Sequence, residues 1–421
     1  MWSSVWGGFP VAARRFLWGG VLLELGHAFL WALQNLYVRS LGFGEEEVGE
    51  VLMSSGVGIV LATVPSAWAY DRLGPRRTLL IAGFAVTVTT VGLVTATTLP
   101  MLCLWSGALG ASFMLHRVIA APFLSSVSEA RQRTQLFSAE FATHTVASVL
   151  GLSVAGLIAR WFAAGGLPET EALRSTLFVA AALGGASTIF YRKLPGRSLD
   201  EVANPFAALL VLKPKHWHMW WRFCVPHVLV GLGAGLTIPF INLYFTDRFG
   251  LDTDAMGFVM AASQVTMTVG ILGMPRIVAR YGMLRGTILT ECLSLPFFLI
   301  LAVTHHFTLA IVAFVFRAAL MNLAHPMWRN LMMDVTPRQW RAGVNGISML
   351  AWNGGWAASN RLGGWIIEHS EGWVYASADG YVLPMLITTA AYLLAIGLEL
   401  KLCWHWRDLG KETPPTVVAE S

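Results

Sequence analysis

Long apolar runs recur along the chain and are separated by short polar segments. A helix that spans the hydrocarbon core of a bilayer needs about 20 mostly apolar residues, and twelve runs reach that length. The expected spans are residues 16–38, 48–69, 78–97, 101–126, 137–160, 173–191, 219–246, 256–276, 286–304, 308–331, 344–367 and 382–402. We therefore predict an all-α membrane protein with twelve transmembrane helices.

The composition agrees with a chain solvated by lipid. Hydrophobic residues make up 55% of the 421 residues and charged residues 13%, with a mean hydropathy of +0.59. A soluble domain carries about 25% charged residues. The net charge is +5, and its basic residues cluster in short loops, which suits membrane orientation rather than nucleic-acid binding. We expect membrane lipid as a partner and no nucleic acid.

Loop charge predicts the orientation. Lysine and arginine concentrate at both chain ends and in the loops after even-numbered spans, whereas the opposite loops are acidic, as at Glu45, Glu46 and Glu47. By the positive-inside rule, both termini face the cytoplasm, and an even number of spans agrees, since it places both termini on one side. We predict a multi-pass protein of the inner (plasma) membrane.

The two halves of the chain resemble each other at an offset of about 208 residues. Gly49 matches Gly257, and Asn35-Leu36-Tyr37 matches Asn242-Leu243-Tyr244 at one residue less. Ordered matches of this kind indicate a duplicated six-helix unit, and the substrate path of such repeats lies at their interface near the midplane. The fold would thus have two pseudo-symmetric six-helix halves.

We place the first half at residues 1–191, a cytoplasmic linker at 192–218, and the second half with its short cytoplasmic tail at 219–421. Within the linker, residues 205–212 could lie flat on the membrane as an amphipathic helix. A plain tether between the halves is the favoured interpretation.

The loop after the second span reads Asp71-Arg72-Leu73-Gly74-Pro75-Arg76-Arg77. This loop resembles the signature Gly-x-x-x-Asp-Arg-x-Gly motif of the major facilitator superfamily, from which Ala67 and Pro75 depart. Together with the repeat, the resemblance covers nearly the whole chain. It implies the MFS fold and a transporter that works by alternating access, and it implies no enzyme activity.

The subfamily motif is incomplete. Residues 147–156 of span five are similar to the glycine–proline pattern of bacterial drug–proton antiporters but lack its proline, and Gly107 stands where those families carry an arginine. The resemblance therefore implies a drug-exporter-like member with an incomplete antiporter motif.

The signature loop also predicts a cytoplasmic gate. An acid at a helix end can pair with basic side chains or with a facing helix N-terminus, so Asp71 is the expected latch. The gate would comprise Asp71, Arg72, Gly74, Arg76 and Arg133. Alternatively, these residues only set the topology.

Ionisable side chains at membrane depth are costly and usually functional. Span one carries Glu24 and His27, and span four carries His116 and Arg117. From the 1.5 Å rise per residue, Glu24 and Arg117 lie at one level. We predict an ion pair or close approach between them, with both histidines nearby and Glu24 as the proton site. A static buried pair is the alternative.

Span five adds Glu140 and His144 at i, i+4, with Ser148 on the same face. A solvated mouth residue and a proton relay are both open interpretations of Glu140. By contrast, His227, Glu291 and Glu399 lie near span ends, where we expect them to reach toward the interface.

Other polar and aromatic residues of the spans predict a substrate cavity. The candidates are Trp31, Asn35, Asn242, Gln264, Arg317, His325, Asn353, Trp356, Asn360 and Arg361. Because Arg117, Arg317 and Arg361 outnumber Glu24, the set leans toward a substrate that is acidic or amphiphilic.

The predicted function is secondary active transport of a small organic solute, with proton-coupled export favoured. A uniporter or importer of a small metabolite and a non-transporting receptor on the same fold are the alternatives. The four cysteines stand singly in apolar runs, so we expect no metal site and no cofactor besides the proton gradient. We expect a monomer.

Overall fold

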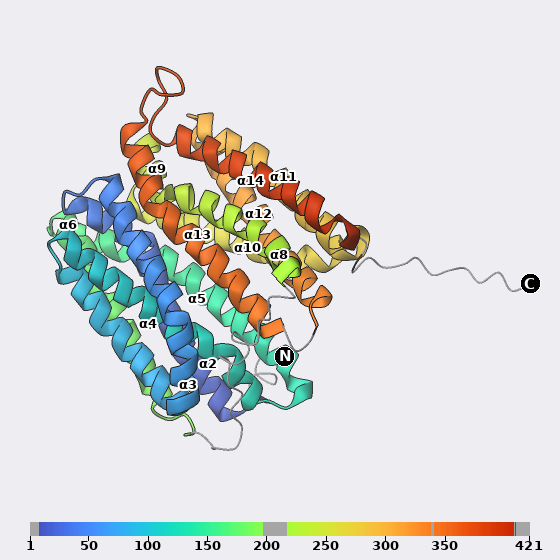
Figure 1. Ribbon diagram of the computed structural model, residues 1–421. Helices are drawn as coiled ribbons and strands as arrows, with labels where there is room; N and C mark the ends of the chain where they lie inside the picture. The colour runs from blue at the N-terminus through green and yellow to red at the C-terminus, as the bar shows by residue number, and fades with distance from the viewer. Residues whose placement is uncertain (1–7, 197–216, 338–340, 408, 410–421) are drawn as a thin grey trace, which may run out of the picture.

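The computed structural model describes residues 8–196, 217–337, 341–407 and 409. Within these ranges the chain is helical, with short connections (Figure 1). The first half contains α2 (Val11–Ser40), α3 (Glu45–Thr95), α4 (Leu99–Ser126), α5 (Ala130–Ala164) and α6 (Glu169–Tyr191). The second half contains α8 (Trp217–Thr237), η2 (Ile238–Phe240), α9 (Ile241–Phe249), α10 (Thr253–Tyr281), α11 (Met283–Val303), α12 (Phe307–Val335), α13 (Arg341–His369), α14 (Val382–Cys403) and η4 (Trp404–Trp406).

The predicted twelve spans are confirmed, although the elements divide differently. Helix α3 crosses twice, because the backbone turns back at Gly74, whose φ is 74°. Only glycine adopts such a φ at low cost. The equivalent position in the second half, Gly282, has φ 80° and separates α10 from α11. Span seven consists of α8, η2 and α9.

Length and composition alone mark ten helices as long and apolar enough to cross a membrane. That number counts α3 once, and it omits α13, which carries the polar residues Asn345, Asn353 and Asn360. Polar side chains in a spanning helix are tolerated where the helix faces protein or a water-filled cavity instead of lipid. The polar residues of α13 therefore indicate that this helix faces the interior of the protein.

Each half packs internally and the halves meet along two helix pairs. In the first half, α2 packs against α5 and α6 and α3 packs against α4, while in the second, α8 packs against α13 and α14. Between the halves, α3 lies beside α13 and α5 beside α10, as Figure 1 shows for the blue and orange helices. These pairs join spans two and eleven and spans five and eight, which the repeat relates to each other.

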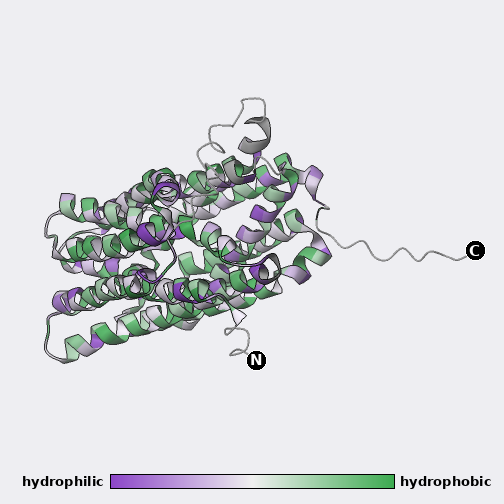
Figure 2. Cartoon of the chain, turned by 90° about the horizontal axis from the view of Figure 1, so that it is seen from below, coloured by the Kyte–Doolittle hydropathy of each residue, from purple (hydrophilic) through white to green (hydrophobic). Residues whose placement is uncertain are grey.

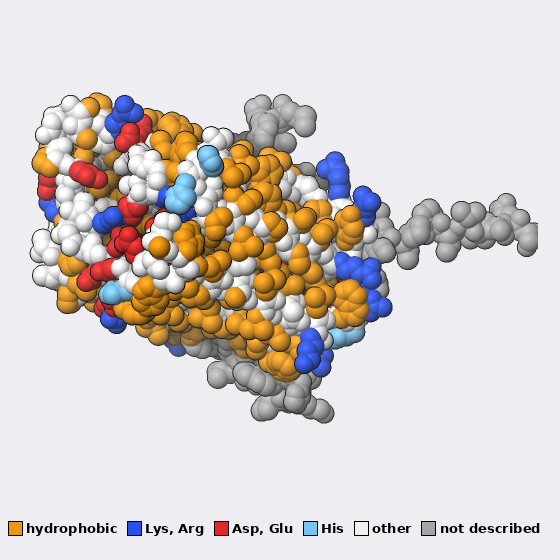
Figure 3. Space-filling model, turned by 90° about the horizontal axis from the view of Figure 1, so that it is seen from above, with side chains coloured by type: hydrophobic (Ala, Val, Ile, Leu, Met, Phe, Trp, Pro, Cys, Tyr) orange, Lys and Arg blue, Asp and Glu red, His pale blue; other side chains and the backbone are white. Residues whose placement is uncertain are grey.

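The surface divides into a band and two ends. Residues of high hydropathy recur along the length of the helices in Figure 2, and hydrophobic side chains cover the middle of the face in Figure 3. Basic side chains gather at the end of the molecule where α14 runs into η4, while acidic side chains gather at the other (Figure 3). We call these the terminal end and the distal end. The charge asymmetry of the loops is thus a property of the folded surface.

The segment at residues 205–212, considered above as an amphipathic helix, lies outside the described residues. The linker at 192–218 and the division of the chain around it stay predictions.

Helices α3 and α4 approach most closely at Gly58, where an added Cβ would overlap the backbone of Gly107. Gly107 itself has little room, since a Cβ there would lie 3.2 Å from the carbonyl oxygen of Ser54. Any side chain at position 107, including the arginine of the antiporter families, would therefore press against the backbone of α3.

Because the crossing cannot widen without cost, Gly58→Val should destabilise the first half by about 1–3 kcal/mol, the usual effect of overpacking. The loss should appear as a lower midpoint of thermal unfolding for the purified protein in detergent. Gly273→Val is the matched control, since nothing lies within 4 Å of a Cβ at that position in α10. Equal midpoints for the two variants would contradict the prediction.

Candidate functional site

A cavity of ≈ 450 Å³ lies between the two halves. Most of the residues predicted for the substrate and proton sites line it: Glu24, His27, Trp31, Asn35, Arg117, Gln264, Arg317, His325, Asn353, Trp356 and Asn360. Of the others, His116 lines a smaller adjoining cavity, and Asn242 and Arg361 lie between this cavity and the distal end. The side chain of Trp31 is 42% exposed and Arg117 is exposed as well, so the cavity is open to solvent.

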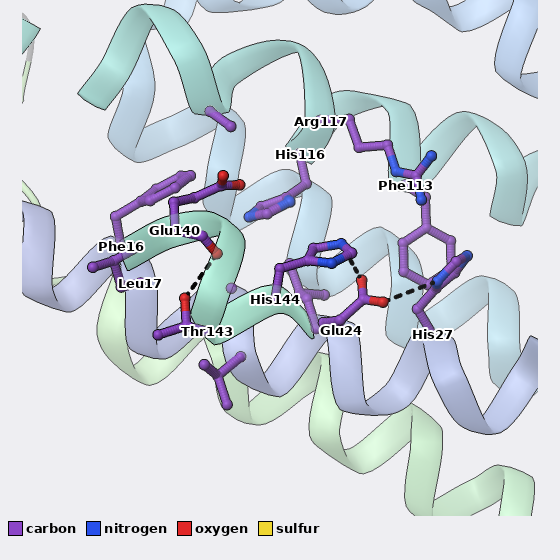
Figure 4. Close-up of a pocket in the computed structure, with 14 residues that line it drawn as sticks. Phe16, Leu17, Glu24, His27, Phe113, His116, Arg117, Glu140, Thr143 and His144 are labelled. Atoms are coloured by element: carbon purple, nitrogen blue, oxygen red, sulfur yellow. Dashed lines mark hydrogen bonds and ion pairs between the residues drawn. The ribbon is translucent and has the colours of Figure 1, made fainter. Parts of the chain in front are cut away.

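Glu24 occupies the boundary between the two cavities, in the middle of α2. Its carboxylate Oε2 lies 2.8 Å from His144 Nε2, and its Oε1 lies 3.8 Å from His27 Nδ1. Figure 4 shows the carboxylate pointing between the two imidazoles. The side chain of Glu24 is 11% exposed, whereas that of His144 is 46% exposed. The buried carboxylate of Glu24 is thus linked to solvent by the exposed imidazole of His144.

The prediction was an ion pair or a close approach between Glu24 and Arg117, and the described side chains form no such ion pair, although both line the same two cavities. Helix α2 packs against α5, which presents His144 to the carboxylate at hydrogen-bond distance. Arg117 projects from α4 into the same cavity and stays exposed there. Depth along the helices predicts that the two residues lie near each other, but packing decides which neighbour faces the carboxylate.

The smaller cavity, of ≈ 120 Å³, lies beneath this group and contains His116 and Glu140. The ring of His116 stacks on Phe16, with centroids 5.4 Å apart and 7° between the planes. Its Nε2 is buried with no hydrogen-bond partner among the described atoms. Titratable side chains thus continue from Glu24 toward the terminal end, and Figure 4 shows them side by side.

In the second half, two carboxylic acids contradict the expectation that they reach the membrane interface. Glu291 of α11 is 5% exposed and Glu399 of α14 is 2% exposed. The two carboxyl groups interact with each other, and one oxygen of each, Oε2, is buried with no hydrogen-bond partner among the described atoms. His227 is also drawn inward, since its Nδ1 lies 2.6 Å from Ser348 Oγ. A buried partner lowers the cost of burial for each group.

Ion pairs join the halves at the distal end. Arg39 Nη1 lies 2.5 Å from Asp247 Oδ1, and Arg361 Nη2 lies 3.0 Å from Glu46 Oε1. A third pair joins Arg160 Nη1 and Asp254 Oδ2 at 2.6 Å. We call these three ion pairs, with the helix crossings beneath them, the distal seal. Because the seal closes one end of the half–half interface, the cavity opens toward the terminal end.

The helix crossings of the seal depend on glycine. A Cβ at Gly49 would overlap the backbone of Asn360, and one at Gly364 would overlap the carbonyl oxygen of Glu45. Both contacts join α3 to α13.

The related crossing of α5 and α10 has the same design, with Gly156 against Thr253 and Gly257 against Leu152. Gly49 and Gly257, and likewise Gly156 and Gly364, are each 208 residues apart. The match of Gly49 with Gly257 indicated a duplication. A search for further glycine pairs at the same offset would also have found Gly156 and Gly364, which lie at these crossings.

Two predicted cavity residues, Asn242 and Arg361, lie at the distal end and do not line the cavity. Asn242 is fully buried and donates from Nδ2 to the carbonyl oxygen of Ala32, 3.2 Å away. Asn35 in turn donates to Asn242 Oδ1 at 3.3 Å. The guanidinium of Arg361 is directed to the acidic start of α3, away from the substrate space.

At the terminal end, the guanidinium of Arg72 lies over the ring of Trp68, 5.7 Å from its centroid. Asp71 is partly buried, and Arg76 and Arg133 are exposed. Gly74 makes the reverse turn described above. The latch between Asp71 and a basic residue stays a prediction.

The outermost ion pair should contribute little to the seal. The side chains of Arg39 and Asp247 are 38% and 28% exposed, and exposed pairs contribute about 0.2–1 kcal/mol. We expect a double-mutant cycle of Arg39→Ala and Asp247→Ala, read by thermal unfolding, to give a coupling below about 1 kcal/mol. A coupling several times larger would mean that the pair, and not the helix crossings, holds the distal end closed.

Comparison with known proteins finds a matching family model and solved structures with a similar fold. The family model described as Major Facilitator Superfamily matches residues 16–226 and again residues 223–416. No curated protein matches the sequence.

Among solved structures, the chain is similar to the nucleoside transporter NupG, at 16% identity and TM-score 0.74, over 93% of this chain and 99% of that one. It is similar to the D-xylose-proton symporter, at 14% identity and TM-score 0.75, over 93% and 97%. It is also similar to a bacterial homolog of the human lysosomal transporter Spinster in an inward-facing conformation, at 12% identity and TM-score 0.73, over 96% and 98%.

Proposed function

Because this chain belongs to the major facilitator superfamily, we propose that it is a proton-coupled secondary transporter of a small organic solute, with Glu24 as the proton site. The observation that carries the proposal is the contact of 2.8 Å between the buried Glu24 carboxylate and the solvated His144 imidazole. An ionisable group at this depth is a functional candidate by default, and here it has a histidine that can deliver its proton.

The chemistry follows from the two states of Glu24. When the carboxylate is charged, protonated His144 and His27 are its natural partners, and when it is neutral, that attraction is lost. Since the group lines both the central and the smaller cavity, a solute entering the central cavity changes the solvation of the carboxylate. Binding of solute and of proton would then be linked, which is the requirement for coupled transport.

The charge distribution supports an orientation. With the basic loops at the terminal end, the positive-inside rule puts both termini in the cytoplasm, so the open cavity would face inward and the distal seal would close the outside. We propose that the protein resides as a monomer in the inner membrane and exports its solute in exchange for protons, with no cofactor.

The neighbouring folds include a nucleoside transporter and a D-xylose-proton symporter. The fold therefore serves solutes and coupling modes of several kinds, and direction is a separate question from proton binding. Symport into the cell and uncoupled uniport are the competing candidates.

One reconstitution experiment distinguishes proton antiport from symport and from uniport. The protein is placed in proteoliposomes that contain a pH-sensitive dye, and a panel of amphiphilic drugs, organic acids and sugars is added outside. Antiport predicts internal alkalinisation as solute enters, whereas symport predicts acidification. A labelled solute that undergoes counterflow with no pH change would contradict proton coupling. Without counterflow for any solute, the transporter proposal itself would fail for that panel.

A further inference from the structure

Arg317 is a buried guanidinium without an acidic partner among the described residues. It lies in the middle of α12, is 4% exposed and lines the central cavity. Its Nη2 donates to the hydroxyl of Tyr392 at 3.2 Å, and its charge lies 4.8 Å from the ring centroid of Phe298. Its Nε is buried with no hydrogen-bond partner among the described atoms.

A guanidinium carries five N–H donors and keeps its charge under all ordinary conditions. Buried charges are normally paired with an opposite charge, because an uncompensated one is expensive. One hydroxyl and one aromatic ring do not neutralise Arg317. The arrangement is that of a binding site whose anion must come from outside the chain.

The potential of the central cavity favours an anion. Among the described residues that line it, Glu24 is the only acid, and its carboxylate is already bound by His144. Arg117 adds a second positive charge to the same lining. An anion entering from the terminal end would thus meet no competing carboxylate near Arg317.

The walls beside Arg317 suit an apolar, planar body. The rings of Trp352 and Trp356 lie 5.1 Å apart between centroids, and Trp31 of the first half lies 6.4 Å from Trp356. His325 meets Trp352 edge-on at 5.8 Å. These aromatic faces line the cavity from both halves, and stacking on them complements a charged group at one end of the ligand.

We propose that Arg317 binds the anionic group of the transported solute, and that this solute is an aromatic or similarly apolar organic anion whose body packs against Trp352 and Trp356. The inference rests on the proposed transport function and names its substrate class. The sequence indicated only that cationic residues outnumber anionic ones. The structure shows one specific guanidinium that is buried, lines the cavity and has no acidic partner among the described residues.

The test compares two ligands of one shape and different charge, 2-naphthoate and its neutral amide 2-naphthamide. Binding to the purified protein is measured by isothermal titration calorimetry without any gradient. Since a hydrogen-bonded charge contributes about 1.5–3 kcal/mol, wild type should bind 2-naphthoate about 10–100-fold more tightly than the amide. Arg317→Gln should bring the two Kd values together by weakening only 2-naphthoate.

Arg117→Gln is the matched control, since it removes the same charge from an exposed position in the same cavity. It should leave most of the preference for the anion, because solvent screens an exposed charge. Arg317→Lys serves if the glutamine variant does not fold. It keeps the charge without the planar fork, so it should weaken 2-naphthoate several-fold and leave 2-naphthamide unchanged.

Three results would overturn the proposal: equal binding of both ligands or no binding of 2-naphthoate by wild type, an unchanged preference in the Arg317 variants, or an equal loss of preference in Arg117→Gln. The last result would mean a diffuse positive potential and no specific site. Because the binding assay needs no proton gradient, its failure is distinguishable from a failure of proton coupling through Glu24.

Discussion

Glu24→Gln should abolish solute-driven proton movement while solute counterflow continues. Glutamine has nearly the shape of glutamate and can still hydrogen-bond His144, but it cannot take up a proton. The structure gives Glu24 its closest polar contact at 2.8 Å to that histidine. We expect proton flux in proteoliposomes to fall at least about 10-fold, since removing the ionisable group removes the coupled state altogether. An internal pH dye and a labelled solute measure both quantities in the same vesicles.

The matched control is Glu140→Gln, which changes another carboxyl group of the smaller cavity. It should retain coupling if Glu24 is the proton site. Full proton flux in Glu24→Gln would refute that role and leave a static buried group. Loss of proton flux only in Glu140→Gln would mean that Glu140, at the mouth of the cavity, binds the coupled proton.

Gly364→Val should open the distal end. A Cβ on Gly364 would overlap the carbonyl oxygen of Glu45, and this contact joins two halves that alternating access must separate. Overpacking costs about 1–3 kcal/mol, but here the strain is relieved when the halves move apart. A bias of this size shifts a two-state equilibrium by about 5–150-fold. The expected result is therefore a change of conformation with little loss of folded protein.

The measurement is a spin-label distance across the distal end, from Leu167 in the first half to Glu371 in the second, both of which are exposed. The four native cysteines, Cys103, Cys224, Cys292 and Cys403, are replaced first. The variant should populate longer distances than its parent.

Gly397→Val is the control, because a Cβ at that position of α14 meets nothing within 4 Å. It should leave the distance distribution of the parent unchanged. If Gly364→Val also leaves it unchanged, the close crossing of α3 and α13 does not hold the seal. If Gly364→Val instead unfolds the protein, the crossing is required in every state of the transport cycle.

The helices were predictable because lipid imposes one simple demand, a continuous apolar segment of sufficient length. The same logic gives depth along a helix but not the direction in which a side chain points. Glu24 and Arg117 were predicted at one level and do line the same cavities, yet the residue that faces Glu24 is His144 of α5. Sequence spacing within single helices contains no information on which neighbour packs there.

Arg361 shows a second limit. It directly follows Asn360, which lines the cavity, but successive residues of a helix point about 100° apart. The guanidinium of Arg361 therefore points to Glu46 in the distal seal. Glu291 and Glu399 show a third limit, since both were expected at the membrane interface and are nevertheless buried against each other. A contact between residues 108 positions apart cannot be found from either helix alone.

Two contacts at the distal end join a residue to its own counterpart in the other half. Arg39 and Asp247 are 208 positions apart and form an ion pair, and Asn35 meets Asn242. This is the pattern of a two-fold symmetric dimer, in which one patch binds its copy. The two copies differ in charge at this position, so in a pair of two first halves Arg39 would meet a second Arg39, and the like charges would repel each other. This difference favours the pairing of a first half with a second half, and the covalent connection adds to the preference because it gives the correct partner an effective concentration in about the millimolar range.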